Sequence, residues 1–158
     1  METETRTATS IEATSAAVWE VLAIPEEWPR WTSSMRTVEL LDGTFKAGSR
    51  LRIRQPGLPP AVWTVTDHRP PAAFTMVSRA PAVVTTAEHV VHRVTRDRTR
   101  LALRLSHSGP LARAAHVLLG GRTRRLVELE AAGMRRAAEH REARALDADD
   151  RTRPTQGS

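Results

Sequence analysis

The sequence predicts an α+β fold in which an antiparallel sheet packs against one long helix. Residues 35–108 contain a succession of short segments with alternating apolar and polar side chains, the period of half-buried strands. Residues 110–141 then carry apolar side chains at a helical period, with charged side chains on the opposite face. Because no other long helix is predicted, the sheet has to be the partner of this helix.

The N-terminal part predicts one strand followed by two short helices. Residues 5–13 alternate β-branched and polar side chains, which indicates the strand. Thr14-Ser15 offers a cap for a helix over residues 16–22, which a proline ends. Residues 25–31 can form a second helical turn with proline at its start. Two such short helices do not make a layer, so they are expected to close one end of a larger element.

Six further strands are predicted between residues 35 and 108, joined in hairpin succession. Asp42-Gly43 and Asp97-Arg98 indicate two of the turns, and pairs of prolines indicate others. Arginines alternate with apolar residues in residues 50–55 and 99–108, so these strands have an arginine-rich outer face. The positions assigned to the inner face are Leu51, Ile53, Gln55, Trp63, Val65, Ala87, His89, Val91, Leu101, Leu103 and Leu105.

The long helix is expected to meet the sheet through a stripe that thins from leucines to small residues. Gly120-Gly121 forms a weak point near its start. The predicted stripe consists of Leu111, Ala115, Leu118, Leu119, Leu126, Leu129, Gly133 and Ala137. Residues 1–145 are therefore expected to form one domain, and residues 146–158, which are polar without an apolar period, a disordered tail.

Composition excludes several classes of protein. The absence of cysteine removes disulfides, thiolate catalysis and cysteine-ligated zinc. No apolar run approaches the roughly 18–20 residues of a membrane span, and the first residues lack an apolar signal core, which predicts a cytoplasmic protein without membrane insertion. The net charge of +6 comes from arginines spread along the chain without a recognisable nucleic-acid motif, so no nucleic-acid partner is predicted.

Several motifs in this order resemble one known superfamily. They are the run from Ser15 to Leu22, Trp28-Pro29-Arg30-Trp31, Leu41-Asp42-Gly43, Gly48-Ser49-Arg50, Gln55-Pro56-Gly57-Leu58, Ser108-Gly109-Pro110-Leu111 and Leu129-Glu130. Over residues 5–141 the sequence resembles the START/Bet v1-like (SRPBCC) superfamily, in particular bacterial polyketide cyclase/dehydrase and lipid-transport proteins. The resemblance implies a helix-grip fold, with a curved seven-stranded sheet wrapped around the C-terminal helix and an apolar cavity between them.

Candidate ligand-binding residues follow from the inner-face register and the helix stripe. His89 is a weak catalytic candidate because imidazole can act as a general acid or base, although a buried histidine can also serve only as a hydrogen-bonding group. Gln55 and His107 are expected either to supply polar contacts or to lie at the rim. The full predicted set is Trp31, Leu51, Ile53, Gln55, Trp63, Met76, His89, Leu103, His107, Leu126 and Leu129.

Other residues allow two readings. Trp28 and Trp31 can form an aromatic mouth or plug the open end of the sheet. Arg122 falls within the apolar stripe, so it either lies along the surface with its head in water or anchors a carboxylate ligand. His68 and His92 are assigned to the outer face. No metal site is predicted, since the histidines lack metal-binding spacings with a matching carboxylate.

The leading functional hypothesis is binding of an apolar or amphipathic small molecule, polyketide-like or lipid-like, without a cofactor. A second hypothesis is a polyketide aromatase/cyclase or dehydrase that uses histidine, glutamine or arginine side chains in the cavity. A third is a protein-interaction module, which requires a filled core without a usable cavity. The sequence is compatible with a monomer or a homodimer, and it does not identify the ligand.

Overall fold

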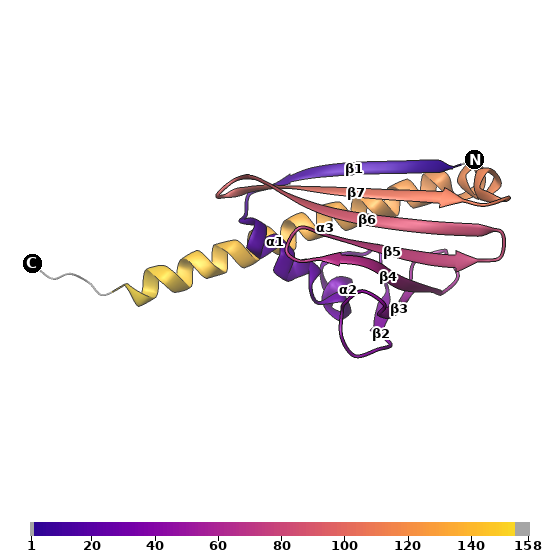
Figure 1. The fold of residues 1–158 in the computed structure, drawn as a ribbon. Coiled ribbons are helices and arrows are strands. Elements are labelled where there is room, and N and C mark those ends of the chain that lie inside the picture. The colour runs from indigo at the N-terminus through magenta and orange to yellow at the C-terminus, as the bar shows by residue number, and fades with distance from the viewer. Residues whose placement is uncertain (1, 154–158) are drawn as a thin grey trace, which may run out of the picture.

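A computed structural model describes residues 2–153, in which seven strands and one long helix dominate (Figure 1). The strands run antiparallel in the order β1-β7-β6-β5-β4-β3-β2, so consecutive strands are neighbours except that β1 lies against β7. The elements are β1 (Thr3–Ile11), α1 (Ser15–Leu22), the 3-10 turn η1 (Pro25–Glu27), α2 (Trp28–Trp31), β2 (Thr37–Leu40), β3 (Arg50–Arg54), β4 (Ala61–Arg69), β5 (Ala73–Ala80), β6 (Val83–Thr95), β7 (Arg98–Ser108) and α3 (Ala112–Thr152). The α+β helix-grip prediction is confirmed.

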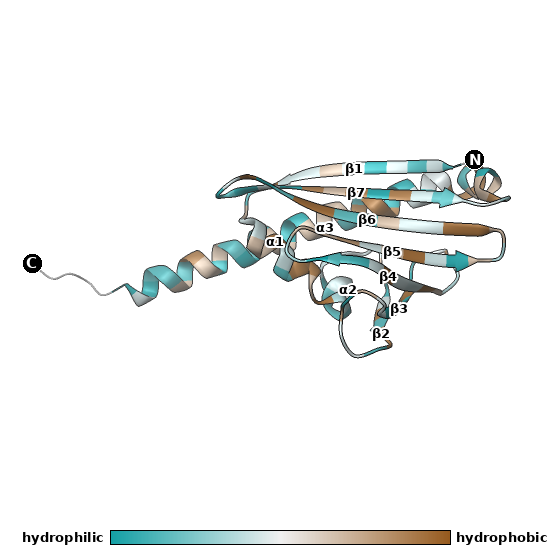
Figure 2. Cartoon of the chain, in the orientation of Figure 1, coloured by the Kyte–Doolittle hydropathy of each residue, from teal (hydrophilic) through white to brown (hydrophobic). Residues whose placement is uncertain are grey.

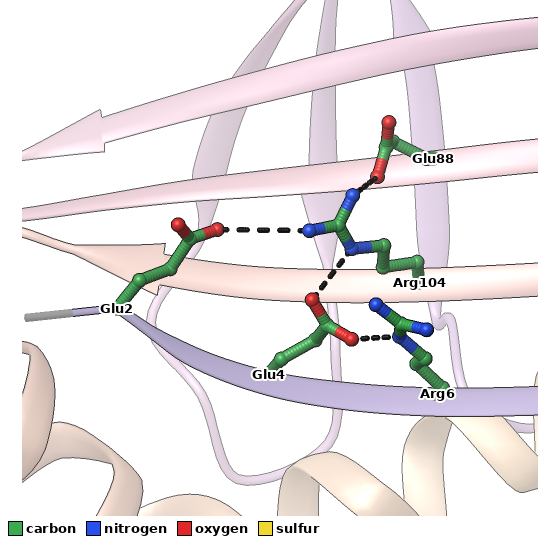
Figure 3. A network of polar contacts seen from close by, with 5 residues as sticks. All are labelled: Glu2, Glu4, Arg6, Glu88 and Arg104. Atoms are coloured by element: carbon green, nitrogen blue, oxygen red, sulfur yellow. Dashed lines mark hydrogen bonds and ion pairs between the residues drawn. The ribbon is translucent and has the colours of Figure 1, made fainter.

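The outer face of the sheet is held together by charged side chains from neighbouring strands (Figure 3). Arg104 of β7 donates to Glu4 of β1 over 2.7 Å and to Glu88 of β6 over 3.0 Å. Arg104 stands opposite Arg6 in the β1–β7 register, and Glu4 pairs with both guanidinium groups. The carboxylate therefore relieves the repulsion that two facing arginines would otherwise cause.

A bulge in β4 changes the face on which His68 lies. Val65 stands opposite Met76, but Asp67 stands opposite Thr75, so Thr66 is an extra residue on this strand. His68 consequently pairs with the buried Phe74, and its ring lies 5.1 Å from the ring of Phe45. The prediction that His68 faces outward is wrong for this reason, whereas His92 is exposed as expected.

Aromatic side chains fill the end of the fold that α1 and α2 cover. Thr14 caps α1 by accepting a hydrogen bond from the Ala17 amide over 3.2 Å, as the sequence predicts. Trp28 is 1% exposed and stacks on Phe74 with 5.9 Å between ring centroids. Its indole nitrogen donates to the Leu22 carbonyl over 3.2 Å. Trp28 is thus a plug at this end of the sheet and not an aromatic mouth.

Helix α3 buries a face that only partly matches the predicted stripe. Leu126 and Gly133 are buried as expected, but Leu111 is 55% exposed and Leu118 is 80% exposed. The buried face is centred further round the helix, because Glu130 lies on it and forms a hydrogen bond there with a strand histidine. The buried residues of α3 are Ala112, Thr123, Leu126, Val127, Glu130, Ala131, Gly133, Met134 and Ala138.

Gly133 marks the closest approach of α3 to the end of α2. A β-carbon at this position would lie 2.9 Å from Cβ of Thr32 and 3.0 Å from the carbonyl carbon of Trp31. These distances are shorter than van der Waals contact, and one of the two atoms belongs to the backbone. Only glycine therefore fits at this crossing.

The C-terminal turns of α3 extend beyond the sheet (Figure 1) and are mostly hydrophilic (Figure 2). The helix runs without a break through Gly120-Gly121 and continues to Thr152. Residues 146–152 of the predicted tail are thus helical here, and good helix formers such as alanine and leucine recur among its last turns. Arg153 follows the end of the helix, and residues 154–158 of that tail lie outside the described residues.

Candidate functional site

A cavity of about 290 Å³ lies between the concave face of the sheet and the first half of α3. Its walls are mainly apolar, and strands β3 to β7 supply one side. The lining residues are Met35, Ile53, Gln55, Leu58, Pro59, Ala61, Trp63, Met76, Ser78, Ala80, Val83, Thr85, Ala87, His89, Leu105, His107, Ala115, Leu119, Thr123, Leu126, Val127 and Glu130. The cavity occupies the half of the sheet that the aromatic plug leaves open.

Seven of the eleven predicted ligand-binding residues line this cavity, and four lie outside it. Those that line it are Ile53, Gln55, Trp63, Met76, His89, His107 and Leu126. Leu51 and Leu103 are buried in the hydrophobic core, in which the aromatic plug also takes part. Trp31 lies at α2 and lines a different cleft, and Leu129 is only half-buried because the buried face of α3 is rotated away from it. The position of a residue on the inner face of a strand therefore did not show whether its side chain lines the cavity or belongs to the packed core.

A histidine–glutamate pair crosses from the sheet to the helix at the floor of the cavity. His89 Nε2 lies 2.7 Å from Oε1 of Glu130, and the two side chains are only 5% and 11% exposed. The imidazole stacks on Phe74 with 4.2 Å between centroids and 11° between planes. The ring is thus fixed in orientation by an apolar neighbour and by a carboxylate.

The second ring nitrogen of His89 has no partner among the described residues. Nδ1 is buried without a hydrogen bond, as are Nε1 of Trp63 and Nδ1 of His107, and all three residues line the cavity. Buried polar atoms are almost always hydrogen-bonded in folded proteins. The three residues line the cavity, whereas the three atoms themselves are buried in its walls.

Glu130 is the functional residue that the sequence reasoning missed. It appeared only in a family motif and was not placed in the cavity. One signal was available: Glu130 is four residues after Leu126 and four before Met134, so a helix places all three on one side. A carboxylate in line with two buried apolar residues requires a buried partner, and an inner-face histidine is the natural one.

Gln55 and Arg122 have protein partners. Gln55 donates through Nε2 to the Ser34 carbonyl over 3.3 Å, which fixes its amide beside the cavity. Arg122 is exposed and donates through Nη1 to the Gly57 carbonyl over 2.8 Å. Arg122 therefore links α3 to the β3–β4 loop, whose Leu58 and Pro59 line the cavity. The alternative in which Arg122 anchors a carboxylate has no support in this geometry.

The environment of His107 predicts a dependence of stability on pH. Burial lowers the pKa of His107 from its ordinary value of 6.5, and the positive charge of nearby His116 lowers it further. Below pH 6.5 the unfolded chain therefore takes up a proton at this residue more readily than the folded chain does. The contribution of neutral His107 to the free energy of unfolding is therefore complete above pH 6.5. It is lost as the pH falls through the lower pKa of His107 in the folded state.

The His107→Gln variant should accordingly resist acid better than the wild type. From about pH 8 to about pH 5, the free energy of unfolding of the wild type should fall further than that of the variant. Urea titrations at several pH values measure the difference. Parallel losses in the two proteins would contradict the assignment.

A second, larger space of about 720 Å³ lies between α1, α2 and the outer half of α3. It is an open surface cleft whose rim carries charged residues, including Glu20, Arg141 and Arg144. The cavity beneath α3 is smaller but is more enclosed and has mainly apolar walls, so it is the candidate binding site. Within residues 2–153 no three histidine, aspartate or glutamate side chains come together in a group that could hold a metal ion.

Comparison with known proteins agrees with this architecture. Residues 2–139 match the family described as polyketide cyclase / dehydrase and lipid transport. No curated protein sequence matches the chain. Among solved structures, a START superfamily protein from Mycobacterium smegmatis shares 14% identity at a TM-score of 0.62, covering 90% of this chain and 98% of its own.

Two further structures extend the similarity. The Zhui aromatase/cyclase from Streptomyces sp. R1128 shares 19% identity at a TM-score of 0.60, with all of both chains covered. Ara h 8.0201 shares 8% identity at a TM-score of 0.62, covering 91% of this chain and 99% of its own. Likeness at these identities establishes a common fold and leaves the chemistry to be argued from the site.

Proposed function

Because the chain belongs to the polyketide cyclase / dehydrase and lipid transport family, we propose that it binds an apolar or amphipathic small molecule in the cavity between sheet and α3. One observation carries the proposal. The cavity has mainly apolar walls that carry a few polar residues, among them Gln55, Thr85 and His107. Small-molecule sites have this composition, with a few polar groups that fix the orientation of an apolar ligand.

The size of the cavity and its polar atoms restrict the ligand. A volume of 290 Å³ equals the liquid volume of about ten water molecules and lies at the small end of ligand sites. A compact molecule of one or two rings, or a short chain, fits better than a full-length lipid. The polar lining residues, among them Ser78, Thr85 and Thr123, favour a ligand that also carries a polar group.

Filling the cavity should abolish binding without unfolding the protein. The Leu126→Trp variant places a larger side chain into the cavity wall, and we expect the affinity for the neutral probe N-phenyl-1-naphthylamine to fall at least about tenfold. Fluorescence titration measures the affinity. Circular dichroism confirms that the fold is retained.

The matched control is Leu146→Trp, which makes the same change at a position that is 63% exposed on the outer turns of α3. This variant should bind the probe as the wild type does. Unchanged binding by Leu126→Trp would contradict the proposed site. Independently of these variants, mass spectrometry of molecules extracted from the purified wild-type protein would identify the ligand class directly.

The His89–Glu130 pair favours a second candidate function, an enzyme that dehydrates or cyclises a polyketide-like chain. In this candidate the carbon beside a carbonyl group gives its proton to the His89 imidazole, whose orientation Glu130 fixes. The β-hydroxyl group then leaves with that proton, so the substrate loses one molecule of water. A β-hydroxyacyl thioester that becomes lighter by one water in the presence of the protein would favour the enzyme, and an unchanged thioester would favour the carrier.

The third hypothesis, a protein-interaction module, required a filled core. The open volume of about 290 Å³ between the sheet and α3 argues against this hypothesis.

A further inference from the structure

The outer face of the first turns of α3 carries an apolar stripe where a surface helix ordinarily has polar residues. Ala114, Val117, Leu118 and Gly121 follow the i, i+3, i+4, i+7 spacing and so share one side of the helix. Val117 is 81% exposed and Leu118 is 80% exposed. These are the two most exposed large apolar side chains in the described part of the chain. We call this set the outer stripe.

Arginines flank the outer stripe on both sides. On the helical wheel Arg113 and Arg124 lie along one edge and Arg122 lies along the other, while Arg125 continues the line of the stripe one turn further on. All four are exposed, and residues 110–127 contain no acidic side chain. None of the four forms an ion pair with another residue in the described part of the chain. The acidic residues Glu2, Glu4 and Glu88 pair instead with Arg104 or Arg6 on the outer face of the sheet (Figure 3).

We propose that the outer stripe docks on the surface of an anionic lipid bilayer. Apolar side chains that project from a helix between cationic side chains suit the boundary between headgroups and acyl chains, where arginine heads remain with the phosphates. This contact is peripheral, and no described helix has the length and apolarity to cross a membrane. A second copy of the chain is a poorer occupant, because a symmetric contact would bring the two sets of arginines face to face.

The position of the outer stripe links it to the cavity. Ala115 and Leu119 line the cavity from the opposite side of the same helical turns. A bilayer contact here would place the cavity wall next to the phase in which an apolar ligand is dissolved. This link to ligand exchange rests on the proposed function, whereas the docking itself does not.

Vesicle co-sedimentation of the full chain tests the docking. The wild type should bind vesicles of phosphatidylcholine with phosphatidylglycerol at low salt, and should bind less at high salt or to phosphatidylcholine alone. Leu118→Glu should reduce the partition coefficient at least about tenfold. Arg124→Gln with Arg125→Gln should reduce it about fivefold for each arginine removed.

Matched controls come from the other end of the same helix. Leu146→Glu and the Arg144→Gln, Arg151→Gln pair make the same changes at exposed positions, and they should leave vesicle binding unchanged. Binding of the naphthylamine probe by Leu118→Glu should also remain, so loss of docking is distinguishable from loss of the cavity site.

Three outcomes would overturn the proposal. One is a wild type that does not bind anionic vesicles at low salt, and another is an equal loss in the Leu146→Glu control. The third is a dimer in analytical ultracentrifugation that Leu118→Glu converts to a monomer while vesicles are ignored. That last result would assign the outer stripe to a contact between copies.

Discussion

The Gly133→Ala variant should lose about 3 kcal/mol or more of its free energy of unfolding. The new methyl group would lie 2.9 Å from Cβ of Thr32 and 3.0 Å from the carbonyl carbon of Trp31. A flexible side chain could move aside, but backbone at the end of α2 can only shift together with the aromatic plug beneath it. Alanine is worth up to about 1 kcal/mol more than glycine inside a helix, and this gain is too small to offset the clash.

Gly121→Ala is the matched control, with the opposite expected sign. Apart from the local backbone of the helix itself, no atom lies within 4 Å of a β-carbon at this position, so the variant gains helix propensity without a clash. Its free energy of unfolding should rise by about 0.5–1 kcal/mol. Urea denaturation of the two variants gives both values. A tolerated Gly133→Ala would show that α2 and α3 are further apart than described.

Replacing Glu130 with leucine should cost about 3 kcal/mol, because the N–H of His89 then loses its acceptor in a buried place. His89→Leu should cost a similar amount by leaving the carboxyl group without its donor. The double variant should recover most of the loss, since two apolar side chains together leave no unpaired polar group. Such recovery would show that the pair is not required for stability.

The exposed Arg52–Glu39 pair provides the control for this cycle. Arg52 Nη1 lies 3.0 Å from Glu39 Oε2, but both side chains are largely in solvent. Glu39→Leu should therefore change the free energy of unfolding by no more than about 1 kcal/mol. If the double variant at His89 and Glu130 instead loses as much as both single variants together, the two losses are independent and the hydrogen bond between the residues is not their cause.

The antiparallel hairpin succession of β2 to β7 could be predicted because local patterns determine it. Alternation over residues 50–55 and 99–108 gave the inner face, and the Thr14 cap gave the start of α1. Such signals lie within a few residues of each other, so one sequence is enough to read them.

The features that the sequence did not reveal depend on contacts between distant segments. The bulge that turns His68 inward involves a single extra residue in β4, which leaves no mark in the alternation. The rotation of α3 depends on a bond between residues 89 and 130. The aromatic plug determines which inner-face residues are core and which line a cavity, and its members come from four different parts of the chain.

The pairing of β1 with β7 also constrains how the chain can assemble. Thr3 stands opposite His107 and Ile11 opposite Thr99, so the first strand finds its neighbour only after nearly all of the sheet has been synthesised. Until then β2 to β6 can pair through short hairpins, which need little loop closure. The long-range closure by β1 adds the largest sequence separation in the sheet, and separations of this kind slow folding. A ribosome-bound chain that lacks β7 thus holds a partial sheet with β6 as an open edge and β1 as an unpaired strand.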